Sequence, residues 1–147
     1  MKCLNCGNEF SLEPTVFKCP ACGAEIPNRS VHSGALSFID KQANKSESPL
    51  GTFTVVVAGE YIDIYKKSAA KVMLMGAAGF LGQYGKLIFS FHKSEITEIK
   101  KNAGFLGKVK SFTIDTRTHT VTFTPGGSVS KNFVSAMDDF AANIGDK

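Results

Sequence analysis

Several side chains and motifs on which common protein activities depend are missing from this sequence. Tryptophan is absent, and the cations are dispersed lysines without an arginine cluster or the stacking aromatics of RNA-binding sheets, so recognition of nucleic acid is weakly supported. There is no G-x-S-x-G elbow, and His92 and His119 lie in polar contexts, so we expect that the protein is not an enzyme. The glycine-rich run at 68–85 lacks the Gly-Lys-Ser/Thr ending of a phosphate-binding loop.

Long apolar runs are also missing. The longest, at 72–82, is well short of the roughly 20 residues that cross a bilayer as a helix, and the first residues run into a cysteine pair instead of a signal-peptide core. The formal charge of +4 would fall to about +2 if the cysteines bound one divalent cation as thiolates, so no polyanionic partner is required. We expect a soluble, cytoplasmic protein whose 147 residues form one moderate domain and one small one.

The four cysteines fall in two copies of the pattern K-C-x-x-C-G, at 2–7 and 18–23. Each pair of sulfurs lies on one side of a tight turn that the following glycine permits, and two such turns facing each other make a tetrahedral four-thiolate site. The pattern resembles a short zinc ribbon with CPxCG in its second knuckle. We therefore predict one structural zinc ion, held by Cys3, Cys6, Cys19 and Cys22, with no open position for a substrate. Rubredoxin-like iron and two disulfides are the alternatives, and disulfides would require an oxidising compartment.

Residues 28–51 are rich in serine, with proline and asparagine, which is the composition of a linker. The apolar run at 35–39 interrupts this segment and is interpreted as a short docked strand or a turn of helix. We thus predict a zinc ribbon at 1–27, a linker at 28–51 and a second domain at 52–147.

From residue 52 the pattern becomes that of a sheet followed by a helix. Strands are predicted at 53–57, 61–65, 86–91 and 96–101. Apolar and polar residues alternate at 112–114 and 121–123 across a short turn, which predicts a β-hairpin. After a Pro-Gly-Gly break the period becomes helical, with an apolar stripe formed by Phe133, Met137, Phe140 and Ile144. The predicted fold class is therefore α+β.

The order of these segments resembles that of bacterial PH-like (GRAM-like) domains. In that family, a sequence pattern of the kind found here at 89–99 precedes the last hairpin, and a helix, here 133–144, closes one end of a bent β-barrel. The resemblance implies a bent barrel capped by a C-terminal amphipathic helix. PH domains that bind inositol phosphates carry Lys and Arg around an open first hairpin loop. The loop interpreted as its counterpart, 58–60, is short and has no cation, so we expect no phosphoinositide binding.

A repeat in the second domain predicts a contact surface. Gly-Phe-Leu-Gly occurs at 79–82 and again at 104–107, and lysines follow each copy. The glycines permit sharp turns that would push the apolar pairs outward, and exposed apolar patches mark partner or membrane surfaces. We predict a contact lip formed by Phe80, Leu81, Phe105, Leu106, Lys86, Lys108 and Lys110. The alternative is that 68–85 forms a short helix or loop packed on the barrel.

These features favour a non-enzymatic adaptor, in which a zinc ribbon is tethered to a PH-like module that contacts a protein partner or a membrane surface. Self-association through the lip is a further expectation. The alternative is a nucleic-acid-associated protein whose ribbon and lysines contact phosphate, because residues 52–111 carry nine lysines and four acids. A phosphate-driven contact would weaken steeply with salt, whereas an apolar contact would not.

Overall fold

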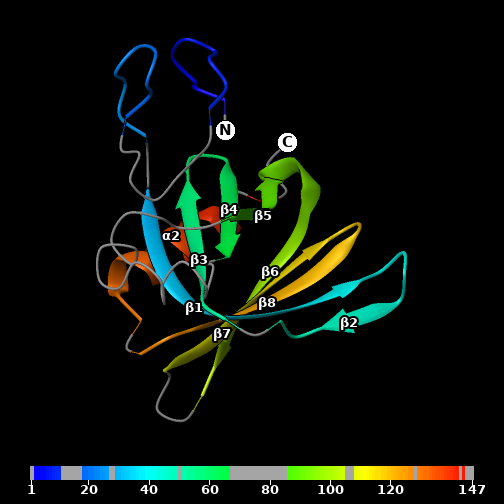
Figure 1. Cartoon of the computed structure of the whole chain (residues 1–147). Helices are drawn as coiled ribbons and strands as arrows, with labels where there is room; N and C mark the ends of the chain where they lie inside the picture. Colours follow the sequence, from blue (N-terminus) through cyan, green and yellow to red (C-terminus); the bar gives the residue numbers. More distant parts are fainter. Residues whose placement is uncertain are drawn as a thin grey trace, which may run out of the picture.

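The computed structural model describes residues 2–10, 18–26, 29–49, 51–66, 86–104, 108–127, 129–142 and 144. In this part of the chain, one α-helix packs on an antiparallel sheet of eight strands, and two short cysteine turns precede the first strand (Figure 1). The predicted α+β class is confirmed. The elements are β1 (Ser30–Asp40), β2 (Lys45–Glu47), β3 (Phe53–Ala58), β4 (Tyr61–Lys66), β5 (Lys86–His92), η1 (Lys93–Glu95), β6 (Ile96–Ala103), β7 (Val109–Thr116), β8 (His119–Pro125) and α2 (Lys131–Ala142).

β1 joins the two halves of the sheet. The strand order is β5-β4-β3-β1-β8-β7-β6, and β2 pairs with the C-terminal end of β1. Residues 30–34 of β1 pair with β3, whereas residues 34–40 pair with β8. Gly34 belongs to both registers, and a β-carbon at this position would overlap the backbone carbonyl oxygen of Thr124. The close approach of the strands at this corner therefore requires glycine.

The position of β1 shows that the predicted linker is wrong. Residues 30–40 form an eleven-residue strand in the middle of the sheet order, and residues 45–47 form β2. Three of the serines that give this segment its linker composition, Ser30, Ser33 and Ser37, are part of the strand, and Ser33 Oγ lies 3.0 Å from Thr54 Oγ1 of β3. Leu36 is buried in the core, and Phe38 packs against that core. Backbone pairing on both edges thus supports a strand whose composition is weakly β-forming.

The hydrophobic core lies between the sheet and α2. In the β7–β8 hairpin, buried residues alternate as predicted, with Phe112 opposite Phe123 and Ile114 opposite Val121. The predicted helical stripe is also confirmed, because α2 contributes Phe133, Met137 and Phe140 to the same core, with Ile144 packed at its margin. Other buried members of this core are Leu36, Phe53, Val55, Val57, Ile62, Ile64, Phe91, Ile96 and Ala136.

α2 begins immediately after Ser130. The Ser130 hydroxyl oxygen accepts a hydrogen bond from the amide of Phe133 at 3.1 Å, which satisfies one of the free amides at the start of the helix. In the part of the chain that the structure describes, no helix has the length and apolar character needed to cross a membrane.

Candidate metal centre

The two cysteine turns are built alike. The amide of the first cysteine donates to a carbonyl oxygen five positions on, at 2.8 Å for Cys3 and 2.9 Å for Cys19. The glycine after the second cysteine donates back to the carbonyl oxygen of the first, at 2.9 Å in both turns. This glycine has a φ of 77° at Gly7 and 74° at Gly23, a conformation that other residues rarely adopt. The repeated pattern in the sequence thus encodes two copies of one knuckle.

The two knuckles bring the four predicted ligands together. Cys3 Sγ lies 3.7 Å from Cys22 Sγ, and Cys6 Sγ lies 3.7 Å from Cys19 Sγ. All four sulfurs lie within 4.8 Å of one another, and all four cysteines are free thiols. Thiolates around a tetrahedral ion with metal–sulfur bonds of about 2.3 Å are roughly 3.8 Å apart, so the cluster has the dimensions of a four-thiolate metal site.

Hydrogen bonds favour the thiolate form at two of these residues. The backbone amide of Cys6, followed by that of Asn5, holds the pKa of Cys3 below its ordinary value. The side-chain amide of Asn5 lies 3.5 Å from Cys22 Sγ and is the main reason that the pKa of Cys22 falls to about 6. At Cys6 the amide of Asn8 lowers the pKa, but desolvation and the neighbouring sulfurs outweigh it and raise the pKa to about 12. A bound cation would displace the remaining protons, so acid should weaken its binding.

The residues that follow the two cysteine knuckles pack against the sheet. Ile26, just after the second knuckle, is buried in a small cluster with Val56 and Ala58 of β3 and Tyr65 of β4, and Phe10 packs against this cluster. Because the neighbouring residues of β3 belong to the main core, the cluster lies on the opposite face of the sheet. Only three residues separate Ile26 from β1. The expectation that a long polar linker separates the ribbon from the second domain is therefore wrong.

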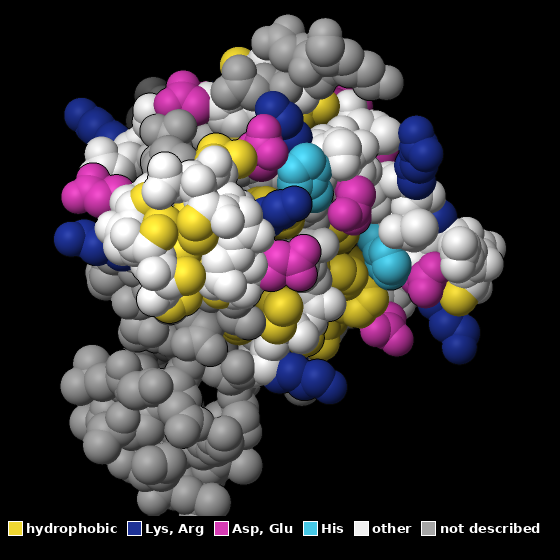
Figure 2. Space-filling model, turned by 90° about the horizontal axis from the view of Figure 1, so that it is seen from above, with side chains coloured by type: hydrophobic (Ala, Val, Ile, Leu, Met, Phe, Trp, Pro, Cys, Tyr) yellow, Lys and Arg dark blue, Asp and Glu magenta, His cyan; other side chains and the backbone are white. Residues whose placement is uncertain are grey.

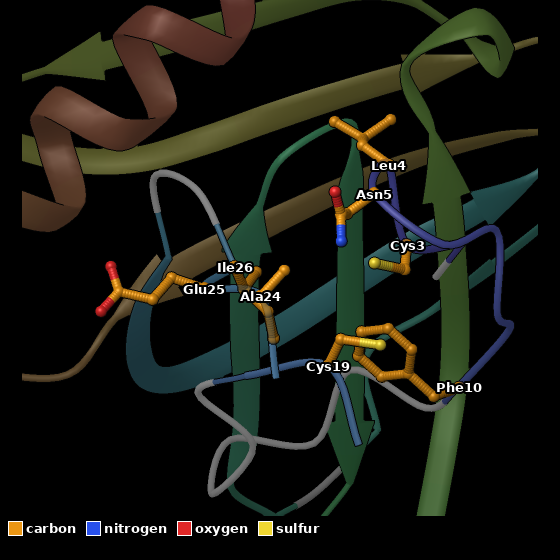
Figure 3. A pocket seen from close by; sticks show the side chains of 8 residues that line it. All are labelled: Cys3, Leu4, Asn5, Phe10, Cys19, Ala24, Glu25 and Ile26. Carbon is orange, nitrogen blue, oxygen red and sulfur yellow. The ribbon is translucent and has the colours of Figure 1, made fainter. Parts of the chain in front are cut away.

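A pocket of about 170 Å³ opens beside the cysteine cluster (Figure 3). Its wall is mainly apolar, and the carboxylate of Glu25 points away from the other labelled side chains. Leu4, which lines the pocket from the first knuckle, is 71% exposed. The full lining is Cys3, Leu4, Asn5, Phe10, Cys19, Ala24, Glu25 and Ile26.

The structure leaves the predicted contact lip largely untested. Phe80, Leu81, Phe105 and Leu106 lie outside the described residues, as does the whole of the segment 68–85. The lysines predicted to flank the lip are described, and Lys86, Lys108 and Lys110 are all exposed.

Sequence reasoning identified the four clustered cysteines but missed the residues around them. Asn5 lies between the two cysteines of its own knuckle, yet its amide reaches a cysteine of the other knuckle. No feature of the C-x-x-C spacing predicts that contact. The packing of Ile26 also gave no local signal, because its partners Val56, Ala58 and Tyr65 lie far along the chain. Comparison of the chain with protein-family models and with curated proteins found no match.

Proposed function

We propose that this protein is a zinc-stabilised binding protein, in which a four-cysteine ribbon docked on a PH-like barrel contacts a protein partner. The observation that carries the proposal is the closed cluster of four sulfurs. Four thiolates fill the coordination sphere of zinc, so the ion would stabilise the fold and leave no position for a substrate or water. Four free thiols also suit a reducing compartment, which supports a cytoplasmic location.

The strand order supports the PH-like assignment. One run of neighbouring strands consists of β5, β4, β3 and β1, the other consists of β8, β7 and β6, and the β1–β8 pair joins them. A helix that follows the last strand buries its apolar stripe in the core between these runs. Folds of this kind carry many unrelated functions, so the assignment supports a binding module and identifies no ligand.

We assign the pocket beside the cysteines to the protein partner. Leu4 is the most exposed large hydrophobic side chain among the described residues. Figure 2 looks onto the end of the molecule that carries the ribbon, and hydrophobic side chains gather there among lysines and acids. An aliphatic or aromatic side chain of a partner would fill the pocket and cover Leu4, as anchor residues do at protein interfaces.

A phosphate-binding mode is less well supported. Several lysines that would have to contact phosphate already pair with carboxylates of this chain, which neutralises them locally. The pairs are Lys41–Asp115 at 2.6 Å, Lys93–Glu60 at 3.2 Å and Lys101–Asp138 at 3.1 Å.

The metal is tested by elemental analysis of protein purified under reducing conditions without added metal. We expect one zinc per chain, loss of zinc in Cys22→Ser, and retained stoichiometry with about 10- to 100-fold weaker binding in Asn5→Ala, because partners of metal ligands have effects of that size. Iron in place of zinc, or disulfides in the native protein, would show that the proposed metal is wrong.

The partner surface is tested by in-cell photocrosslinking. A benzophenone amino acid at position 4 should give a discrete crosslinked protein, whereas the same probe at the exposed position 45 on β2 should not. Two further binding assays test the membrane and nucleic-acid alternatives. One uses vesicles that contain anionic lipid and the other uses a DNA duplex, and each is repeated over a range of salt concentrations. If the chain binds vesicles and Phe80→Ser with Phe105→Ser abolishes that binding, the lip serves a membrane and the assignment of the pocket fails.

A further inference from the structure

β6 is an edge strand with an open side. Within the described residues it pairs with β7 alone, so the backbone amides and carbonyls of its other edge have no strand partner (Figure 1). The pairing with β7 is regular between two register shifts, one after Ile96 and one after Asn102. A further strand could therefore add to β6 over only a short stretch, which lies within residues 98–102.

Two opposite charges lie on the outer face of this stretch. Glu98 and Lys100 pair with Asp115 and Thr113 of β7, while Ile99 between them lies opposite the buried Ile114 and faces the core. The side chains of Glu98 and Lys100 are 55% and 65% exposed, and their charged atoms make only a loose contact of 3.8 Å. Both charged groups are therefore accessible to another surface.

We propose that β6 pairs with β6 of a second copy of this chain, antiparallel and centred on Ile99. In this register, Glu98 of each copy lies opposite Lys100 of the other, so the two-fold axis generates two opposite-charge pairs. Ile99 of one copy meets Ile99 of the other on the core side, where each is already half-buried.

Charge selects this register over its neighbours. A two-fold axis perpendicular to the sheet places opposite each other only residues that point to the same face. The possible registers therefore differ in which residue lies on the axis, and the nearest alternatives place Glu98 or Lys100 there instead of Ile99. Centring on Glu98 places the two glutamates opposite each other, and centring on Lys100 does the same with the two lysines. Like charges directly opposite destabilise a strand pair, so both alternatives are disfavoured. The short regular stretch makes the dimer weak, and low ionic strength should strengthen it.

The test is a charge swap followed by sedimentation velocity over a range of protein concentrations at low salt. Glu98→Lys and Lys100→Glu each convert the two attractive pairs into repulsive ones, so each should weaken dimerisation by roughly tenfold or more. The double variant restores opposite charges and should restore the dimer. An equimolar mixture of the two single variants should give a heterodimer, because one then carries two lysines and the other two glutamates. Lys131→Glu, an exposed charge reversal at the start of α2, is the matched control and should leave dimerisation unchanged.

Glu98→Lys should not impair folding, so loss of the dimer in this variant can be assigned to the interface. Glu98 lies opposite Asp115 within the sheet, so a lysine at position 98 replaces a like-charge neighbour with an opposite one, and thermal unfolding should show an intact fold. A chain that stays monomeric up to about millimolar concentration overturns the proposal. A dimer that resists both single variants, or that the double variant fails to restore, also overturns it by placing the interface elsewhere.

Discussion

Truncating Ile26 should destabilise the sheet, although this residue belongs to the cysteine ribbon. Ile26 is only 8% exposed and is buried with Val56, Ala58 and Tyr65 of the sheet. Truncating a buried isoleucine to alanine costs about 2–5 kcal/mol, depending on how far the site can collapse. Because this cluster is small and lies near the surface, we expect Ile26→Ala to cost about 2 kcal/mol of the free energy of unfolding, at the low end of that range.

The assay is urea and thermal unfolding followed by far-ultraviolet circular dichroism, because the sheet dominates the described structure. For a chain of this size, about 2 kcal/mol corresponds to a fall in Tm of roughly 4–8 °C. The metal content of the variant is measured in the same preparation. Retained metal with a lowered Tm shows that the loss arises from the contact between ribbon and sheet.

Leu4→Ala is the matched control. Leu4 belongs to the same ribbon and is also a large aliphatic residue, but it is 71% exposed, so its truncation should change stability by no more than about 0.5 kcal/mol. If Ile26→Ala unfolds with the same midpoint as the native chain, the ribbon and sheet are energetically independent. The packing of Ile26 on the sheet would then contribute nothing to stability.

Two further predictions concern the sheet. Gly34→Ala should cost about 1–3 kcal/mol, because the new methyl group meets rigid backbone of β8, whereas Gly104→Ala meets only the flexible side chain of Lys110 and should be near neutral; comparing the two midpoints in urea checks this. The hydrogen bond from Lys41 lowers the pKa of Asp115, so Asp115 stabilises the fold above its ordinary, unfolded-state pKa of about 3.9, and that contribution is lost as the pH falls through the lower folded value. Since both groups are more than a third exposed, Lys41→Ala should remove less than about 1 kcal/mol at pH 7 and flatten this acid dependence, and an unchanged pH profile would contradict the assignment.

The features that sequence analysis predicted correctly are those with a strong local signal. Alternation at 112–114 and 121–123 predicted the hairpin, and the stripe from Phe133 to Phe140 predicted α2, because each pattern reports one buried face of one element. The cysteine spacing likewise predicted the cluster, since two cysteines with two residues between them on a tight turn leave few other arrangements of their sulfurs.

β1 could not be predicted from a local sequence pattern, because the contacts that stabilise it are made with distant segments of the chain. Its sequence, SVHSGALSFID, has serines and a glycine where a typical strand has β-branched residues. What makes it a strand is pairing with β3 on one side and β8 on the other, segments up to about 90 residues distant along the chain. The docking of Ile26 was missed for the same reason, since its partners lie on strands that follow β1.

The position of β1 changes the argument for expecting no phosphoinositide binding. The turn at 58–60 joins β3 to β4 and is therefore not the first hairpin loop of the sheet; that loop follows β1 and begins at Lys41. Lys41 is a cation where the PH-like resemblance implies that inositol phosphates bind, but its Nζ already donates to Asp115 Oδ1 and to the Thr116 carbonyl oxygen, both at 2.6 Å. We therefore still propose that the barrel does not recognise inositol phosphates, because the ammonium group of Lys41 is neutralised by its own chain. Titration calorimetry with inositol hexakisphosphate should show no binding, and binding that disappears in Lys41→Ala would prove the loop to be a phosphate site.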